Sequence, residues 1–303
     1  MSKAAVIGLG TMGPGMAATL ARGGMTVTAY DVGEAQRTQA PALIAQAQKV
    51  LGLLGKEDRG GSVTVVHSLG EALAEATLVL ETVPERLEIK RPLYREIDAL
   101  VGPDCIIASN TSGMPIGSLQ EGVSHPGRVV GMHWSNPPHV IPVVEVIAGA
   151  ETSQATVARV RDLVEALGLL PVMVRKDVPG FIENRILYAL LRECVDLVEQ
   201  GVIDAEGLDT CVSWGIGYKL SVIGPMALLD VAGLDIYQAV GSYLNSDLST
   251  RSDVSAYVTE RTAAGRLGMK TGGGIFDYTA EEAAALREAR AKKLVAVRKA
   301  LEG

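Results

Sequence analysis

His133 and Glu145 stand twelve positions apart and are the pair of residues whose types most directly suggest chemistry. They belong to the stretch GMHWSNPPHVIPVVEV, in which Pro137 and Pro138 separate two strand-like runs. Because a proline cannot donate to a β-ladder, the chain must leave the sheet between these runs. An imidazole has a pKa of about 6.5, and a neighbouring carboxylate orients it and stabilises its cation. The pair therefore suits removal of a hydroxyl proton while hydride leaves the same carbon.

The spacing alone leaves a structural role for His133 open. Three further histidines complete the count of four. His67 and His125 lie in loop-like segments, and we expect them to be solvated or structural. His139 follows the two prolines and could reach a substrate pocket.

A glycine-rich segment, AVIGLGTMG, ends one strand-like run and opens a helix-like one. Gly8, Gly10 and Gly13 have the G-x-G-x-x-G spacing, with Thr11 and Met12 between the last two. The first glycine permits a tight turn, the second lets the backbone approach a pyrophosphate, and the third lets the helix pack on the strand. The N-terminus of the helix attracts the anion. The segment predicts a dinucleotide-binding loop, and an ordinary strand–turn–helix is the alternative.

The next strand-like run, MTVTAYD, ends in Asp31, eighteen residues after Gly13. A carboxylate at this position can bind the ribose 2′-hydroxyl and would repel a 2′-phosphate. The sequence therefore predicts NAD rather than NADP as the cofactor.

Apolar runs and helix-like segments alternate over the first 180 residues. Helices are expected at 13–24, 87–101 and 153–168. The runs are rich in β-branched residues and apolar throughout, as in strands covered on both faces. They are KAAVIGLG, MTVTAYD, VTVVHS, TLVLETV, CIIASNT, GRVVGMHW, VVEVIAG and PVMVRKD.

Beyond about residue 181 only helical periodicity remains, at 183–201, 204–215, 224–244 and 279–301. Alternating β and α units favour a parallel sheet with right-handed crossovers. We therefore expect an α/β fold: a Rossmann-like, mostly parallel NAD-binding domain at 1–180, and an all-helical substrate and dimerisation domain at 181–303.

Composition limits the function classes. The 303 residues are 48% hydrophobic, enough for two packed domains, and the net charge of −7 without long blocks disfavours nucleic acid and anionic membranes as partners. Cys105, Cys194 and Cys211 form no CxxC or Cys/His cluster, so no metal site is predicted. Their odd number fits a reducing compartment. With no signal-peptide layout and no apolar run of about twenty residues, we expect a cytoplasmic protein without a membrane anchor.

Eight blocks in order along nearly the whole chain resemble the 3-hydroxyacyl-CoA dehydrogenase family. They are GLGTMG, ETVPERLEIK, SNTSGMPI, HWSNPP, VVEVI, DVPGFIENR, GPMALLD and KTGGG. Several blocks in the right order are far more specific than one glycine motif. The resemblance implies an NAD-dependent dehydrogenase with a small-molecule substrate and a homodimer built by the C-terminal helices.

The resemblance also implies roles for individual residues. His133 is the implied general base and Glu145 its partner. Ser112, of NTS, and Asn184, of GFIENR, are implied hydrogen-bonding groups near the substrate oxygen and the nicotinamide. Four further residues match positions that line the family's cofactor site: Glu85, Lys90, Asn136 and Lys270.

Two departures bear on the substrate. Members that act on acyl-CoA carry a longer, lysine-rich helical hairpin after the second strand, whereas residues 32–62 are short and their cations are opposed by acids. HWSNPP replaces the usual HFFNPV and resembles members that do not act on thioesters, the carnitine and gulonate dehydrogenases. These features resemble members that act on small free acids. A further resemblance within the family, carried by MHWSNPPH, GFIENRILYALLRECVDLVE and DTCVSWGIGYK, implies oxidation of a small carboxylated aldehyde, with His133 acting on water or the aldehyde hydrate. A 3-hydroxyacyl-CoA or a free 3-hydroxy acid is the alternative substrate.

Two other hypotheses compete with this one. The segment GLGTMGPGMAATLARGGMTVTAYD also resembles the 3-hydroxyisobutyrate dehydrogenase family, but residues 165–190 lack that family's G-x-x-x-K-x-x-N pattern. A non-catalytic Rossmann binder would have no need for a base, its carboxylate partner and two hydroxyl-binding residues together.

Trp134 or Tyr218 either stacks on an aromatic substrate or packs in the core.

Overall fold

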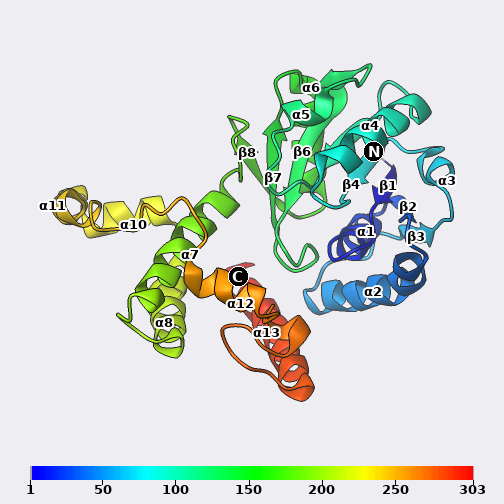
Figure 1. Cartoon of the computed structure of the whole chain (residues 1–303). Coiled ribbons are helices and arrows are strands. Elements are labelled where there is room, and N and C mark those ends of the chain that lie inside the picture. The colour runs from blue at the N-terminus through cyan, green and yellow to red at the C-terminus, as the bar shows by residue number, and fades with distance from the viewer. Residues whose placement is uncertain (1, 303) are drawn as a thin grey trace. The chain divides into compact units, whose positions relative to one another are not determined.

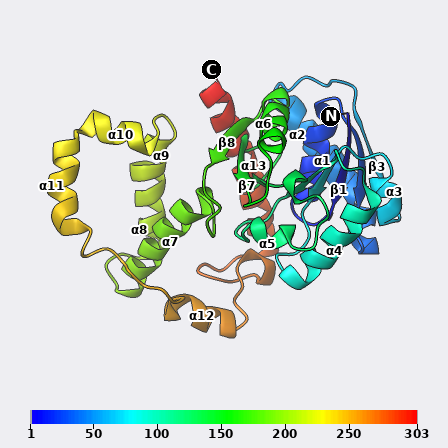
Figure 2. The same ribbon diagram turned by 90° about the horizontal axis from the view of Figure 1, so that it is seen from above.

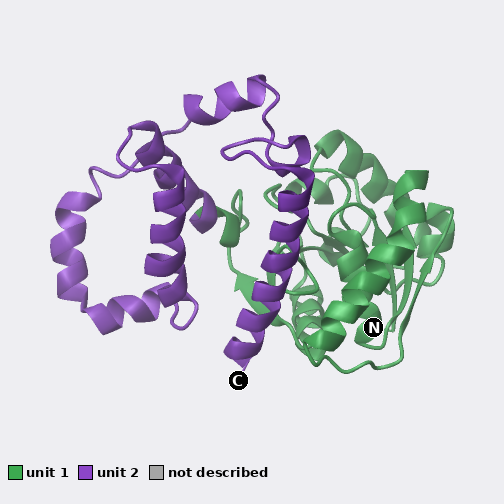
Figure 3. Ribbon diagram, turned by 90° about the horizontal axis from the view of Figure 1, so that it is seen from below, with its two compact units in different colours: residues 1–185 green, residues 186–303 purple. Residues whose placement is uncertain are grey.

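The computed structural model describes residues 2–302. They form two compact units, Met1–Arg185 and Ile186–Gly303 (Figure 3). The sequence analysis places the boundary after residue 180, and the helix α7 (Glu183–Glu199) crosses the division at 185.

The first unit contains one eight-stranded sheet with the order β3-β2-β1-β4-β5-β6-β7-β8 (Figure 1). All neighbouring strands are parallel except β6 and β7. Six strands fall within the predicted runs, and β3 and β8 each begin one residue before theirs, which confirms the mostly parallel α/β fold. The strands are β1 (Lys3–Ile7), β2 (Thr26–Tyr30), β3 (Ser62–Val65), β4 (Leu78–Glu81), β5 (Ile106–Ser109), β6 (Val129–Trp134), β7 (Val143–Ala148) and β8 (Leu170–Val174).

Alternate residues of the strands pack into two separate hydrophobic cores, one on each face. In β1, Ala4 and Val6 belong to the core under one set of helices, whereas Ala5 and Ile7 belong to the other. The helices on the first face are α1 (Gly13–Arg22), α2 (Glu34–Leu53) and α6 (Gln154–Ala166). Those on the second face are α3 (Leu69–Leu73), α4 (Leu87–Leu100) and α5 (Gly117–Gln120) (Figure 2). The short 3-10 turn η1 (Pro126–Arg128) leads into β6. Because both faces are covered there, β4, β5 and β6 are buried throughout, as the sequence predicted, whereas the edge strands β3 and β8 are partly exposed.

The segment after β2 contains a single helix, α2, followed by a loop that leads to β3. Four residues of α2 are buried: Ala40, Ile44, Ala47 and Leu51. Arg37 donates to the carbonyls of Asp31 and Val32, and Arg59 pairs with Glu57 at 3.5 Å. The region therefore holds one amphipathic helix, with two of its cations occupied by local partners.

The described part of the second unit is helical, apart from isolated bridges among Gly268, Gly273 and Asp277. This confirms the predicted all-helical C-terminal region. No single helix among the described residues meets the length and hydropathy of a membrane span, although the bent pair 205–220 and 225–232 does so together. After α7 the elements are α8 (Ala205–Cys211), the π-helical η2 (Val212–Gly217), α9 (Tyr218–Leu220), α10 (Pro225–Ala232), α11 (Leu234–Leu244), α12 (Ala256–Ala263), η3 (Met269–Thr271) and α13 (Ala280–Glu302).

Candidate active site

The carboxyl ends of β4, β5 and β6 are tied together by side-chain hydrogen bonds. The Asn110 side chain donates to Thr82 Oγ1 at 3.4 Å and accepts from the backbone N–H of Trp134 at 2.8 Å. Ligands of open α/β sheets bind outside this edge. The segments that follow these strands are therefore held where a substrate and a cofactor are expected.

The glycine-rich loop follows β1 at the same edge. Gly8 has φ +102°, and a Cβ on it would lie 2.6 Å from the carbonyl oxygen of Thr82. A Cβ on Gly13 would lie 1.9 Å from the carbonyl oxygen of Gly8. A Cβ on Gly10 would meet nothing within 4 Å, and Gly10 and Thr11 are exposed. The helix α1 begins without a side-chain cap, and apart from Pro14, which has no N–H, the backbone of its first turn can donate to a pyrophosphate. The loop fits the dinucleotide that the sequence predicted.

Asp31 braces this loop from the end of β2. Its Oδ2 accepts from the Leu9 N–H and its Oδ1 from the Gly33 N–H, both at 2.7 Å. A carboxylate has about four acceptor sites, so both oxygens retain capacity for a ribose hydroxyl. The same charge would repel a 2′-phosphate, and the site fits NAD.

His133 and Glu145 face each other across the antiparallel pair β6 and β7. His133 Nδ1 lies 2.7 Å from Glu145 Oε2, and both side chains are buried. A carboxylate accepts, so Nδ1 carries the proton in this pair and Nε2 is left with a free lone pair. The buried pair presents a base held in one tautomer.

The second oxygen of Glu145 binds the start of α7. Oε1 accepts from the backbone N–H groups of Ile182 at 2.8 Å and Glu183 at 3.1 Å. The preceding residues Gly180 and Phe181 have φ of 77° and 48°, so the chain turns sharply before the helix. A left-handed Phe181 costs about 1–3 kcal/mol, and its buried ring packs against His133 with centroids 5.8 Å apart.

These donors determine the ionisation of Glu145. Burial alone would raise the pKa of this carboxyl. The hydrogen bond from His133 and the two backbone N–H groups outweigh burial, so the pKa lies below its ordinary value near 4.5. The N-terminus of α7 also favours a negative charge. Glu145 is therefore a carboxylate at neutral pH.

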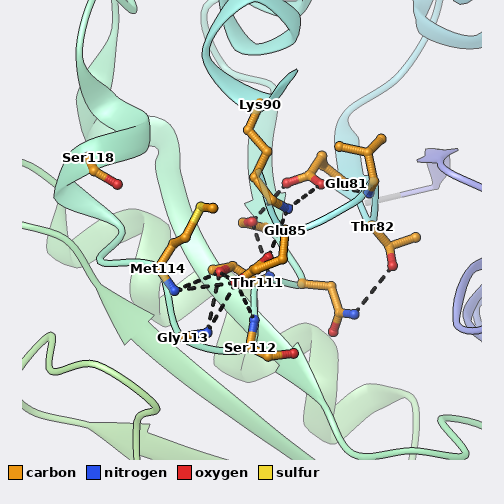
Figure 4. A network of polar contacts seen from close by, with 12 residues as sticks. Glu81, Thr82, Glu85, Lys90, Thr111, Ser112, Gly113, Met114 and Ser118 are labelled. Carbon is orange, nitrogen blue, oxygen red and sulfur yellow. Dashed lines mark hydrogen bonds and ion pairs between the residues drawn. The ribbon is translucent and has the colours of Figure 1, made fainter. Parts of the chain in front are cut away.

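Ser112 lies in a loop held by Glu85 (Figure 4). Glu85 Oε1 accepts from the backbone N–H groups of Ser112, Gly113 and Met114 at 3.0, 3.2 and 3.4 Å, and also from the Thr111 hydroxyl. Burial would raise the pKa of Glu85, but these donors and Lys90 lower it. The charged carboxylate fixes the backbone that carries Ser112.

Lys90 points toward Glu81 and Glu85 and is fully buried (Figure 4). Its Nζ is 2.6 Å from Glu81 Oε1 and 3.5 Å from Glu85 Oε2. Glu81 Oε2 accepts from the Tyr94 hydroxyl at 3.1 Å and the Ser109 hydroxyl at 2.8 Å. Burial and the charge of Glu81 raise the pKa of Tyr94 well above its usual range. This network pins α4 to the ends of β4 and β5.

Three further predicted residues have different surroundings. Asn184 donates to the Ser112 carbonyl at 2.9 Å, so it joins the start of α7 to the Ser112 loop. Asn136 is exposed in the loop after β6. Lys270 lies in η3, within the second unit.

The aromatic residues and the other histidines considered in the sequence analysis differ in how far they are buried. Trp134 is 1% exposed within a core cluster, so it packs rather than stacks on a ligand. Tyr218 is 66% exposed in the second unit. His67 and His125 are exposed, whereas His139 packs on Gly15 of α1, and burial lowers its pKa.

The structure adds a residue that the sequence analysis missed. Glu183 accepts a hydrogen bond from the Ser135 hydroxyl, and one of its oxygens lies within 4.8 Å of ligand atoms of His133 and Glu145. Nothing in the sequence separates Glu183 from other first-turn glutamates, because its approach depends on the turn at Gly180 and Phe181. Such a trio also has the spacing of a metal site, but His133 and Glu145 are engaged with each other.

The ionisation of Glu145 predicts a pH-dependent stability difference. In Glu145→Gln an amide N–H₂ replaces an acceptor, and we expect a loss of about 1–3 kcal/mol at pH 7. Since the folded pKa is depressed, this contribution is full above about pH 4.5 and declines as the pH falls below it. Urea unfolding, followed by Trp134 fluorescence in a Trp214→Phe background, measures the difference. The exposed Glu96→Gln is the control, and a difference that stays constant down to pH 3 would contradict this account.

Family models match the chain over almost its whole length. Residues 3–178 match the 3-hydroxyacyl-CoA dehydrogenase NAD-binding domain, and residues 180–278 match the C-terminal domain of the same family. The matches agree with the blocks recognised in the sequence. They also identify the glycine-rich loop as part of an NAD-binding domain.

Individual relatives lie in the same family. The chain is 60% identical over 302 residues to 5-formyl-3-hydroxy-2-methylpyridine 4-carboxylate 5-dehydrogenase of Mesorhizobium japonicum, covering 99% of this chain and 98% of the relative. A solved structure of an enzyme of that name, described as an NAD⁺-dependent dismutase, has a TM-score of 0.98 and 59% identity, with 100% and 99% of the two chains covered. L-Carnitine dehydrogenase of Oceanobacillus iheyensis is 34% identical, over 77% of this chain and 76% of its own. The chain belongs to the 3-hydroxyacyl-CoA dehydrogenase family and is an NAD-dependent dehydrogenase.

Proposed function

We propose that the chain oxidises 5-formyl-3-hydroxy-2-methylpyridine 4-carboxylate, a small carboxylated aldehyde, to the corresponding dicarboxylate in vitamin B6 degradation. The main support for this substrate is the 60% identity, over nearly the whole chain, to the relative named for it. The blocks MHWSNPPH, GFIENRILYALLRECVDLVE and DTCVSWGIGYK resemble the same enzyme.

The His133–Glu145 pair supports the chemistry. Bound NAD supplies the acceptor for hydride. His133 Nε2 takes the proton of a hydroxyl on the reacting carbon, and Glu145 stabilises the imidazolium that results. Ser112 and Asn184, whose loop and helix are hydrogen-bonded to each other, bind near the reacting oxygen and the nicotinamide.

The cofactor contacts are part of the same proposal. The backbone of Gly8, Gly10, Thr11, Met12 and Gly13 surrounds the pyrophosphate, and Asp31 binds the ribose. Exposed Asn136 and partly exposed Glu85 are available to the nicotinamide half. Lys90 acts through Glu85, because its ammonium group is buried, and Lys270 is the contact proposed from the second unit.

The alternative substrate is a (S)-3-hydroxyacyl-CoA. A single helix stands where the acyl-CoA enzymes of the family carry a lysine-rich hairpin, and Arg37 and Arg59, between β2 and β3, are engaged by local partners. A polyanionic CoA would find few free cations there. We therefore favour the small aldehyde.

A direct assay compares the two substrates. Purified protein and NAD are incubated with the formylpyridine carboxylate or with (S)-3-hydroxybutyryl-CoA, and NADH is followed at its absorbance maximum. We expect turnover of the aldehyde, with a kcat/KM at least about 100-fold above that of the thioester. Turnover of the thioester alone would refute the proposed substrate and favour the alternative.

We also propose a cytoplasmic homodimer formed through the C-terminal helices. In the described second unit, α8, α10 and α11 bury none of their residues, although α10 and α11 are largely apolar. Exposed apolar groups of this density mark an interaction surface, and the family resemblance favours a second copy as the occupant. The three cysteines are free, as suits a reducing compartment.

Light scattering tests the dimer. A chain of 31.8 kDa is expected to elute with twice that mass. Charged substitutions at exposed Met226 and Tyr237, on α10 and α11, are expected to shift the mass toward one chain. A wild-type mass of one chain at micromolar concentration would contradict the proposal.

A further inference from the structure

The aldehyde oxidation proposed above requires a water molecule as well as a base. Addition of water to the aldehyde carbon forms a hydrate with two hydroxyl groups. Loss of a hydroxyl proton and of hydride from that hydrate gives the carboxylic acid. Oxidation of an alcohol, or reduction of an aldehyde by NADH, needs no such water. A site that oxidises an aldehyde gains from a group that binds and activates water beside the His133–Glu145 pair.

Glu183 is placed for that task. It occupies the first turn of α7, where its own backbone N–H binds Glu145 at 3.1 Å. Its carboxylate oxygen lies within 4.8 Å of both His133 and Glu145. One water molecule that hydrogen-bonds to two groups at about 2.8 Å each can bridge groups up to about that far apart.

The surroundings of Glu183 distinguish it from Glu145. Both oxygens of Glu145 are occupied, by His133 and by the start of α7, and its side chain is buried. Glu183 is exposed, and its Oε2 accepts from the Ser135 hydroxyl, which is itself buried. Among residues 2–302 no group hydrogen-bonds to its Oε1. Buried Glu145 already accepts from three donors and supports His133, whereas exposed Glu183 keeps one carboxylate oxygen without a hydrogen-bond partner among residues 2–302.

We propose that Glu183 is a second catalytic carboxylate, which binds and deprotonates the water that hydrates the aldehyde, and that Ser135 positions it. The water oxygen bonds to the aldehyde carbon as Glu183 takes one water proton, and the carbonyl π-bond becomes an alkoxide that recovers this proton. The product is the hydrate, with no change in oxidation state. His133 then removes a hydroxyl proton and hydride passes to NAD, which yields the acid and NADH. The inference rests on the proposed function.

The test compares two reactions of one variant. Glu183→Gln keeps the shape and the bond from Ser135 but cannot take a proton. We expect its NAD-dependent oxidation of the formylpyridine carboxylate to fall about 100-fold, and its NADH-dependent reduction of the same aldehyde to stay within about threefold of wild type. Ser135→Ala is expected to show a smaller loss confined to oxidation. Glu88→Gln, in the first turn of α4, removes an equivalent exposed charge and is expected to change neither reaction.

An isotope effect gives an independent readout. With the formyl hydrogen replaced by deuterium, hydride transfer is slowed but hydration is not. In Glu183→Gln hydration becomes rate-limiting, so the isotope effect on oxidation is expected to fall toward one. An equal loss of both reactions, an unchanged oxidation rate, or an undiminished isotope effect would each overturn the role of Glu183.

The two proposals fail separately. If the wild-type protein turns over no formylpyridine carboxylate, the proposed function fails and takes this inference with it. If the wild type oxidises the aldehyde and Glu183→Gln matches it, only the inference fails. Thermal melting of each variant shows whether a loss reflects unfolding.

Discussion

The contact on which the rest of the site depends is the hydrogen bond between two buried side chains, His133 and Glu145. A buried carboxylate is costly unless its charge is matched by donors. Here the imidazole satisfies one oxygen, and the first N–H groups of α7 satisfy the other. A helix start leaves N–H groups without internal partners, so the contact satisfies these donors as well as the carboxylate of Glu145. One interaction thus fixes the base, its tautomer and the entry of α7.

That arrangement has consequences along the chain. The antiparallel turn between β6 and β7 is needed because it places the two residues opposite each other, whereas the rest of the sheet is parallel. The turn at Gly180 and Phe181 is needed because it aims α7 at Glu145. Asn184, on the first turn of α7, then holds the carbonyl of Ser112, while Glu85 holds its N–H. The loop that carries Ser112 is therefore held by the same helix start that keeps Glu145 charged.

The sequence predicted the sheet and the glycine-rich loop because each leaves a local signal, whereas the pairing of His133 with Glu145 came from the resemblance to a family. Apolar runs mark strands buried on both faces, and glycine spacing marks the loop. The contacts that required the structure have no local signal. Glu81 reads as one more residue of a strand, yet it joins Lys90, Tyr94 and Ser109 from two other elements. Glu183 lies near His133 and Glu145 only because the left-handed turn at Gly180 and Phe181 directs the start of α7 toward them. Trp134, left open by the sequence, lies in the core because its position on β6 faces α1 and α6.

The central claim is that His133, held by Glu145, is the base for hydride transfer to NAD. The most direct test replaces His133 with Ala and measures both the single-turnover rate of NADH formation and the affinity for NAD. The account predicts a loss of about 10²–10⁴-fold in the rate, with the NAD dissociation constant unchanged. A rate within about threefold of wild type would contradict it, because another group would then be taking the proton.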